Sequence, residues 1–314
     1  MNKSIPIVFC IDHRMVMQLG VTITSLMLNA NGTEYDIIVV IDETVLEEDR
    51  NRILSMKKLF GVSITLVTVT NQFDSLKISN PTWSKACYYR LLLPNLLPNY
   101  DTVIYSDVDI VFQSSLAEAF CPIDDYYVAA CQDVNTSNRK KRIRILDLAP
   151  GQIYFCAGFM IMNLKKFREL GLVQKALELS KRNFVYMDQD VLNYLCKGHV
   201  YYLSPFVCRF SLCVLPINPI EKETLLTPED ITRSLNVAAI HYISSSKPWN
   251  SFCHRWEVWW HYYMLSPFFD HNFYRQRQYE LIKGSNLSFI DRCKLLGRYF
   301  TEKGGPFRRL FSHK

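Results

Sequence analysis

Three short runs rich in Ile and Val, separated by helix-like segments, constrain the fold of this chain more than any other feature of its sequence. The runs span residues 5–11, 35–41 and 62–69. Of the segments between them, 18–29 is apolar nearly all round and 46–60 is amphipathic. Continuous apolar strands joined by helical crossovers are typical of a parallel sheet that is buried on both faces. The sequence therefore predicts an α/β fold with a mostly parallel sheet flanked by helices.

The same alternation continues to about residue 250. Further strands are predicted at residues 101–109, 126–131, 159–162, 200–203 and 237–241, and further helices at 83–94, 164–170, 173–182 and 188–197. The first of these helices is expected to stop at Pro94. We therefore expect one α/β domain over residues 1–250, followed by a helical extension over residues 251–314.

No apolar stretch approaches the ~20 residues that a transmembrane helix needs, and the first apolar run reaches Asp12 too soon for a signal peptide. The ten cysteines include no Cys-x-x-Cys pair, which excludes the usual zinc and redox motifs and predicts reduced thiols. We therefore expect a cytoplasmic protein whose only membrane contact is peripheral.

The C-terminal extension is basic and aromatic. Residues 250–314 contain 11 of the 36 Lys and Arg residues but only 5 of the 30 Asp and Glu residues, so the whole formal charge of +6 lies there. Cations interleaved with Phe, Tyr and Trp suit an anionic membrane surface, and we expect attachment to its cytoplasmic face. A C-terminal helical cap is the structural alternative. Nucleic-acid binding is an alternative of another class, but no motif supports it, so no nucleic-acid partner is expected.

Two carboxylates, Asp107 and Asp109, end the apolar run that contains residues 103–105. In an extended chain both project to one side and Val108 to the other, so that they could share one cation. Adjacent carboxylates repel each other unless a positive charge compensates, and oxygen ligands suit Mg²⁺ or Mn²⁺. The tripeptide alone is weak evidence, because Asp-x-Asp occurs again at residues 188–190 and two solvated carboxylates explain it as well.

A second polar cluster follows the apolar run at 237–240. His241 could complete a metal site, where its nitrogen would favour Mn²⁺, and Lys247 could hold a phosphate as a point charge. The alternative is a turn with a hydrogen-bonded histidine and a solvated lysine. In open α/β sheets ligands bind at the carboxyl ends of strands, where both clusters are predicted. A nucleotide-dependent oxidoreductase or NTPase is disfavoured, because the chain has no matching glycine-rich loop.

Together these motifs resemble those of glycosyltransferase family 8, which includes bacterial lipopolysaccharide galactosyl- and glucosyltransferases and glycogenin. The resemblance extends from residue 5 to about residue 250, in the family's order. The motifs are Tyr88-Tyr-Arg-Leu, Asp107-Val-Asp, Phe155-Cys-Ala-Gly-Phe with Asn163-Leu-Lys-Lys, Asp188-Gln-Asp, and His241-Tyr followed by Lys247-Pro-Trp. The resemblance implies a GT-A type fold with a mixed, mostly parallel sheet, UDP-galactose or UDP-glucose as donor, Mn²⁺ or Mg²⁺, and retention of anomeric configuration.

The resemblance also implies roles for individual residues. Asp107, Asp109 and His241 match the metal ligands. The donor-binding positions are Asp12, which would contact uracil, Lys247, which would contact the diphosphate, and Val108, Ala157, Gly158 and Ser244. The residues expected around the donor sugar, and counted as catalytic, are Arg90, Asp188 and Gln189, of which Gln189 would lie nearest the anomeric carbon. Asp190 is expected to be structural, because a carboxylate in the first turn of a helix interacts favourably with the helix dipole.

The chain departs from the family pattern at three places. After the first strand, Arg14 replaces a small amide and Met15 an aromatic residue. Cys156 stands where Asn is common, and Ser244 stands where glycine is common. These differences leave the base and the sugar of the donor open.

We therefore expect a retaining hexosyltransferase that moves galactose or glucose from a UDP-sugar to a glycan or glycolipid acceptor, such as lipopolysaccharide or another surface polysaccharide. A glycogenin-like self-glucosylating protein is the second hypothesis, because 18 tyrosines offer acceptor hydroxyls. A retaining glycosidase is disfavoured, because its carboxylates flank the scissile bond ~5 Å apart. The basic run at 139–144 is expected in a polar connection, either solvated or in contact with a phosphorylated acceptor.

Overall fold

The computed structural model of the chain describes residues 4–70, 73, 84–133, 136–148, 152–182, 184–203, 209–210, 238–243, 247–251, 253 and 255–284. Its N-terminal part contains the predicted alternation of strands and helices. These elements are β1 (Ile5–Ile11), α1 (Val16–Leu28), β2 (Tyr35–Ile41), α2 (Glu47–Phe60) and β3 (Ser63–Thr68). Gly61 ends α2 in the left-handed conformation, at φ 63°, which glycine adopts without steric cost.

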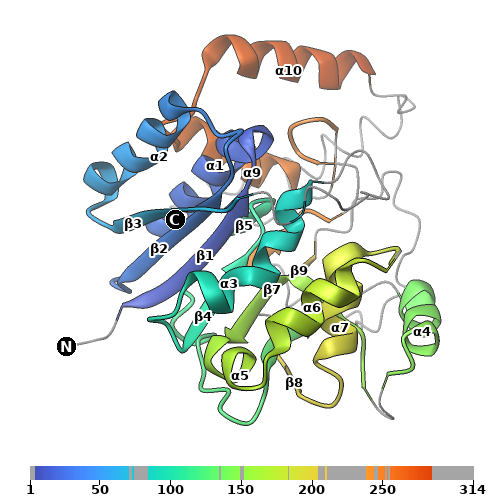
Figure 1. Cartoon of the computed structure of the whole chain (residues 1–314). Coiled ribbons are helices and arrows are strands. Elements are labelled where there is room, and N and C mark those ends of the chain that lie inside the picture. The colour runs from blue at the N-terminus through green and yellow to red at the C-terminus, as the bar shows by residue number, and fades with distance from the viewer. Residues whose placement is uncertain are drawn as a thin grey trace, which may run out of the picture.

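Seven strands form the main sheet in the order β3-β2-β1-β4-β7-β6-β8 (Figure 1). Its later strands are β4 (Thr102–Ser106), β6 (Val128–Gln132), β7 (Phe155–Asn163) and β8 (Val200–Tyr202). All neighbours are parallel except β7, which runs antiparallel to both β4 and β6. The sheet is therefore mixed and mostly parallel, as expected. Because β1 and β4 are parallel neighbours, the residues that follow them meet at one edge.

A second, three-stranded sheet joins distant parts of the chain. Its strands are β5 (Ile110–Phe112), β9 (Arg209–Phe210) and β10 (Ala239–His241), in the order β5-β10-β9. β10 pairs antiparallel with β5, and His241 lies opposite Ile110. This register places His241 beside the residue that follows Asp109.

The helices differ from the predictions in two places. Besides α1 and α2, the described helices are the 3-10 helices η1 (His13–Met15) and η2 (Lys85–Leu92), and α3 (Leu93–Leu96), α4 (Thr136–Ile145), α5 (Leu164–Glu169), α6 (Leu172–Ser180), α7 (Met187–Leu195), α9 (Trp256–Leu265) and α10 (His271–Gly284). Pro94 does not end a helix but lies in the first turn of α3, where its missing N–H costs no hydrogen bond. The basic run at 139–144 lies in the connection between β6 and β7, as expected, but it is part of helix α4 and not a loop.

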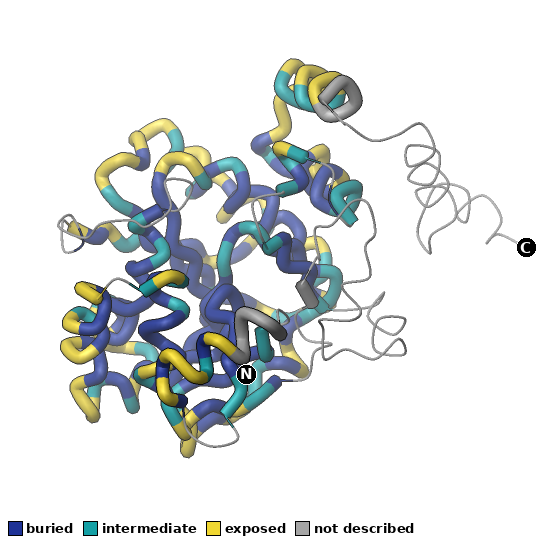
Figure 2. Tube along the Cα trace, turned by 90° about the vertical axis from the view of Figure 1, so that its right-hand side faces the viewer, coloured by how far each residue is buried: buried dark blue, intermediate teal, exposed yellow. Residues whose placement is uncertain are grey.

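The main sheet separates two hydrophobic layers, and alternate residues of β1 face each of them. Ile7 and Phe9 belong to the layer that includes residues of α1 and α2. Val8 and Cys10 belong to the layer that includes residues of η2, α6 and α7. In Figure 2 the buried part of the trace fills the centre of the molecule. Burial on both faces explains why the strands are apolar throughout.

Helix α9 packs on the α/β part through its aromatic side chains. Trp259, Trp260 and Tyr263 form one buried cluster with Val21 of α1 and Ile240 of β10. Residues on both sides of position 250 thus share a hydrophobic cluster, and the domain boundary there stays a prediction. Helix α10 lies over this layer as a partly exposed cover (Figure 1). Within the described ranges, no helix combines the length and the apolar character that crossing a bilayer requires.

Candidate metal and donor site

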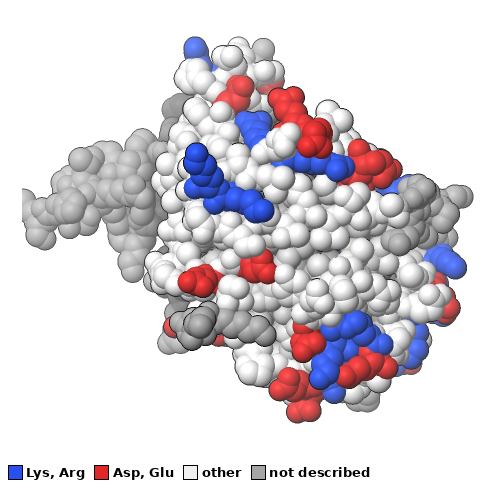
Figure 3. Space-filling view, turned by 60° about the vertical axis from the view of Figure 1, so that its left-hand side comes forward, with Lys and Arg blue, Asp and Glu red and all other residues white. Residues whose placement is uncertain are grey.

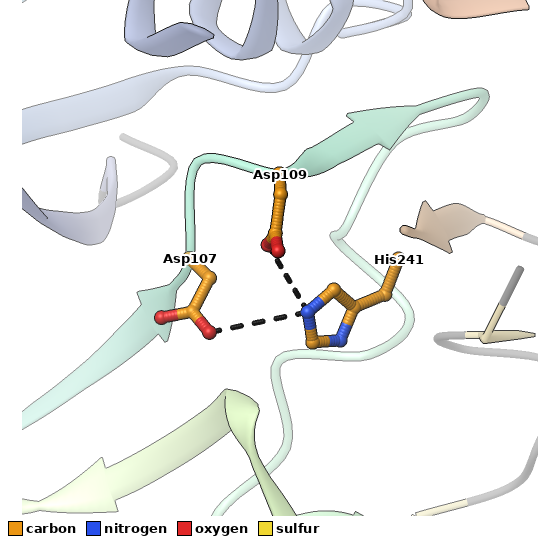
Figure 4. A group of neighbouring side chains, drawn as sticks. All are labelled: Asp107, Asp109 and His241. Carbon is orange, nitrogen blue, oxygen red and sulfur yellow. Dashed lines mark ion pairs between the residues drawn. The ribbon is translucent and has the colours of Figure 1, made fainter. Parts of the chain in front are cut away.

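Asp107, Asp109 and His241 come together where the main sheet meets the three-stranded sheet (Figure 4). Asp107 follows β4, Asp109 precedes β5, and His241 ends β10. His241 Nε2 lies 3.1 Å from Asp109 Oδ1 and 3.9 Å from Asp107 Oδ2. One possible ligand atom from each residue lies within 4.8 Å of the other two. The structure thus brings together the three residues predicted as metal ligands.

The turn between β4 and β5 is anchored to helix α1. The Thr22 hydroxyl contacts the carbonyl oxygens of Val108 and Ile110, each at 2.8 Å. The Val108 side chain is buried in the hydrophobic core, and its burial leaves the flanking carboxylates on the opposite side of the chain. Val108, which was predicted to bind the donor, therefore presents its side chain to the core.

Gly158, on β7, leaves room for the cluster. Its carbonyl oxygen accepts the N–H of Asp107 at 2.7 Å. A Cβ at this position would lie 2.8 Å from Asp107 Oδ2 and 3.0 Å from His241 Nε2, and closer still to the imidazole carbon Cε1. Real Cβ atoms are rarely this close to other atoms. The missing side chain therefore creates the space in which the ligand atoms of Asp107 and His241 converge.

Lys247 adds a positive charge beside Asp109. Its Nζ lies 2.5 Å from Asp109 Oδ2 and also donates to the carbonyl oxygen of Tyr242. Burial raises the pKa of Asp109, but Lys247 and His241 outweigh this effect and hold that pKa well below its usual range. Among the described residues, Asp109 Oδ1 is buried without a hydrogen-bond partner, although His241 Nε2 is within ion-pair distance.

These residues fit a divalent cation. Two carboxylates and one imidazole form a donor set that suits Mn²⁺. Asp109 Oδ1 is buried and faces His241 Nε2 at 3.1 Å without a hydrogen bond that a described residue donates, so a cation bound there would stabilise its charge. Because Gly158 has no side chain, nothing on β7 fills the space between Asp107 Oδ2 and His241 Nε2 at this position. Asp107, Asp109 and His241 could therefore hold the ion.

Arg90, on η2, links this cluster to α7. Its guanidinium lies 2.7 Å from Asp107 Oδ1, 3.1 Å from Asp188 Oδ2 and 2.5 Å from the carbonyl oxygen of Ala157. It also stacks over the ring of Tyr105, 4.2 Å from the centroid. Burial raises the pKa of Asp188 to about 7, although the charge of Arg90 opposes this shift. Arg90 thus fixes the positions of Asp107 and Asp188.

Gln189, in the first turn of α7, is held at both ends of its side-chain amide. Its Oε1 accepts the N–H of Ala157 at 3.0 Å. Its Nε2 donates to Asp133 Oδ2 and to the Tyr154 hydroxyl, each at 3.2 Å. These bonds fix which end of the amide is oxygen and which is nitrogen. Ala157, predicted to bind the donor, takes part in the site through its backbone groups.

Asp12 caps helix η1 and accepts several hydrogen bonds. Its Oδ1 accepts the N–H of Arg14 at 2.9 Å, and its Oδ2 accepts the Arg14 guanidinium at 2.8 Å and the Ser84 hydroxyl at 2.5 Å. Burial raises the pKa of Asp12, but the bonds from Arg14 and Ser84 outweigh it and lower that pKa. Asp12 follows β1, at the same sheet edge as Asp107. Ser244, also predicted to bind the donor, lies outside the described residues.

Several residues that hold the predicted ones in place were not identified from the sequence. Tyr105 donates its hydroxyl to Asp107 Oδ1 at 2.6 Å. Tyr105 lies on β4, two residues before Asp107, and the alternation of side chains along an extended chain could have indicated this contact. Tyr154 and Asp133 have no such local signal, because they reach Gln189 only through the tertiary structure.

Comparisons with known proteins identify a family. The family model of glycosyl transferase family 8 matches residues 6–253. Lipopolysaccharide 1,2-glucosyltransferase of Escherichia coli is 26% identical over 264 residues, which cover 82% of this chain and 75% of that protein. Lipopolysaccharide 1,3-galactosyltransferase of Salmonella typhimurium is 25% identical over 281 residues, which cover 84% of this chain and 76% of that protein.

The comparison of folds agrees with the comparison of sequences. The crystal structure of galactosyltransferase LgtC, in complex with donor and acceptor sugar analogs, matches with a TM-score of 0.73 and 25% identity. The match covers 87% of this chain and 100% of that chain. The expected GT-A type fold is therefore confirmed. The chain belongs to glycosyl transferase family 8 and is a glycosyltransferase related to the lipopolysaccharide glucosyl- and galactosyltransferases.

Proposed function

We propose that the chain is a retaining, Mn²⁺-dependent hexosyltransferase that moves galactose or glucose from a UDP-sugar to a glycan hydroxyl, with lipopolysaccharide or another surface polysaccharide as acceptor. The observation that carries the proposal is the convergence of Asp107, Asp109 and His241, with Lys247 bound to Asp109 beside them. Similarity to lipopolysaccharide transferases supports the choice of sugar and acceptor.

The cluster suits the diphosphate of the donor. When bound at Asp107, Asp109 and His241, a divalent cation supplies a Lewis acid that stabilises negative charge on the leaving diphosphate; Mg²⁺ is the second choice. Lys247 has a flexible stem and three donors, so its ammonium can turn from Asp109 to a phosphate oxygen. Asp12 would accept the uracil N–H after giving up one of its bonds to Arg14.

The sugar would lie between the diphosphate and α7. Arg90, Asp188 and Gln189 would surround it, with Gln189 nearest the anomeric carbon. The Gln189 amide cannot act as an acid or base at neutral pH, so its role is to bind and orient. The acceptor oxygen would bond to the anomeric carbon on the face from which the phosphate oxygen departs, and the leaving diphosphate would take the hydroxyl proton. This course retains configuration and requires no protein nucleophile.

Peripheral contact with an anionic membrane through the C-terminal extension is part of the proposal. Exposed apolar side chains near α9 and α10 support it, namely Met264, Leu265, Phe269 and Tyr279. Acidic and basic side chains are interspersed on the face shown in Figure 3, so that face suits an anionic surface less well. Residues 285–314 of the extension lie outside the described residues. Cosedimentation of the full chain with anionic vesicles, but not neutral vesicles or duplex DNA, is the expected result.

The central test is a panel of UDP-sugars, each assayed for UDP release and transfer with and without Mn²⁺. We expect one UDP-hexose to react, and Asp109→Asn to lower the Mn²⁺-stimulated rate at least ~100-fold, because Oδ1 loses its charge. Asp101→Asn is the matched control, since Asp101 is an exposed aspartate before the same strand β4. Wild-type rates in Asp109→Asn would refute the metal role. Hexose added to the chain itself, seen by intact mass, would favour the self-glucosylating alternative.

A further inference from the structure

The connection between β6 and β7 is bonded to helix α7 and to Lys197, which comes after that helix. Two of these bonds lie beyond the site. Lys197, just after α7, pairs with Asp147 at 3.2 Å, and Gln152 donates to the carbonyl oxygen of Asn193 at 3.3 Å. The connection contains the basic helix α4. The connection that contains helix α4 is therefore bonded to the helix that carries Asp188 and Gln189.

Arg142 differs from the other cations of α4 whose exposure is described. It is 5% exposed, whereas Lys141 and Arg144 are exposed. Its Nη1 lies 2.8 Å from Oδ2 of Asp190, which is fully buried in the first turn of α7. A buried ion pair holds its elements strongly in place, since removing one partner leaves an uncompensated buried charge.

Hydrogen bonds continue from this pair to Gln189. Asp190 Oδ1 accepts the Tyr154 hydroxyl at 2.8 Å, and the oxygen of that hydroxyl accepts Gln189 Nε2 at 3.2 Å. Because the Tyr154 proton is used on Asp190, only the lone pairs of that oxygen face Gln189. The direction of every bond is therefore set: Gln189 donates to Tyr154, Tyr154 donates to Asp190, and Asp190 accepts from Arg142.

We infer that Arg142 is a positioning residue for this glycosyltransferase, because it holds Asp190 and Tyr154 in the arrangement that orients the Gln189 amide. The inference rests on the proposed place of Gln189 beside the donor sugar. Arg142 itself touches no residue of the metal cluster in any described contact. Its loss should therefore change the turnover of bound donor more than the binding of metal or of donor.

The test compares Arg142→Met with Arg144→Met, which makes the same change of charge at an exposed position of the same helix. We expect Arg142→Met to lower kcat ~10- to 100-fold, as a small displacement of a positioned group does, with KM for the UDP-sugar and the affinity for Mn²⁺ within about twofold. Arg142→Lys, which keeps the charge, should recover part of kcat. Equal kcat in Arg142→Met and Arg144→Met, or a rise in KM alone, would overturn the inference.

A double variant separates positioning from stability. Arg142→Met with Asp190→Leu replaces the buried ion pair by apolar groups, which commonly preserves stability. We expect its Tm to approach that of the wild type while kcat stays low, because Tyr154 has lost its acceptor. Recovery of kcat together with Tm would reduce Arg142 to a purely structural role.

A readout without substrate keeps this inference distinct from the proposed function. The Gln189 side-chain NH₂ signal, assigned by its loss in Gln189→Glu, should shift in Arg142→Met and stay unchanged in Arg144→Met. A wild type that turns over no UDP-sugar would refute the proposed function, and the NMR comparison would still decide whether Arg142 positions Gln189. An unchanged Gln189 signal in Arg142→Met would refute the positioning role.

Discussion

Gly158→Ala tests the geometry of the metal cluster with a single methyl group. The new Cβ would lie 2.8 Å from Asp107 Oδ2 and 3.0 Å from His241 Nε2, whereas ordinary van der Waals contacts of Cβ atoms begin at 3.4 Å. To reach that separation the Asp107 oxygen must move by ~0.6 Å, and the imidazole must move by more than the ~0.4 Å that its Nε2 requires, because its Cε1 would be closer still. Metal–ligand distances tolerate only ~0.2 Å, so both shifts are too large for the original coordination.

The expected effect is on metal affinity more than on the fold. Misplacing ligands in this way should weaken Mn²⁺ binding ~10- to 100-fold, which corresponds to ~1.4–2.8 kcal/mol. Overpacking of the buried strand β7 should lower the free energy of unfolding by ~1–3 kcal/mol. The two effects need separate measurements, because a partly unfolded protein would also bind less metal.

Free Mn²⁺, followed by electron paramagnetic resonance during a titration, gives the affinity, and thermal unfolding without metal gives the stability. Gly20→Ala is the matched control, because its Cβ would lie 2.8 Å from Cγ of Phe268, and closer to other atoms of that ring, in another part of the core. Both variants should lose stability, and only Gly158→Ala should lose affinity. Wild-type affinity in Gly158→Ala would show that the ligand atoms do not meet beside Gly158.

Two further variants test cations that occupy carboxylates of the site. Lys247→Met should bind Mn²⁺ several-fold more tightly without nucleotide, because Asp109 loses a competing cation. The same variant should bind UDP ~10- to 100-fold more weakly, because a charge-assisted contact is lost. Isothermal titration of both ligands measures these changes, and a loss of affinity for both ligands would contradict them. Arg14→Ala should make UDP a ~10-fold stronger inhibitor by freeing Asp12 to accept the base, and unchanged inhibition would show that Asp12 does not bind it.

The strands were predictable because burial on both faces of the sheet requires continuous apolar runs, which can be recognised in a short stretch of sequence. The runs at 5–11 and 35–41 coincide with β1 and β2. Pro94 was misread because a proline at a helix boundary fits two interpretations: it can end the helix before it, or it can lie in the first turn of the helix that begins there. Helix α4 was missed because its sequence has no apolar face. The ion pair between Arg142 and Asp190 joins α4 to α7, and the local sequence pattern does not reveal this pair.

The residues of the candidate site could be named from the sequence, but their arrangement in space could not. Asp107 and Asp109 are two residues apart, so an extended chain would place both carboxylates on one side. His241 meets them only because β10 pairs with β5 in a register that puts His241 opposite Ile110. A shift of that register by one residue would turn His241 away from the carboxylates. The place of all three residues after predicted strands indicated one possible metal site, and the family resemblance then implied that the three are its ligands.

The two carboxylates of the cluster are not equivalent, and the difference bears on how the donor binds. Each uses one oxygen on a protein cation and turns the other toward His241. Asp107 is held by Arg90, whose side chain is only 4% exposed, whereas Asp109 is held by Lys247, which is 20% exposed. Moving Arg90 would break its bonds to Asp188 and Ala157 as well, so that half of the site is fixed before any ligand arrives. Lys247 has fewer constraints, and a diphosphate that draws it away from Asp109 would release negative charge for the cation at the moment the donor binds.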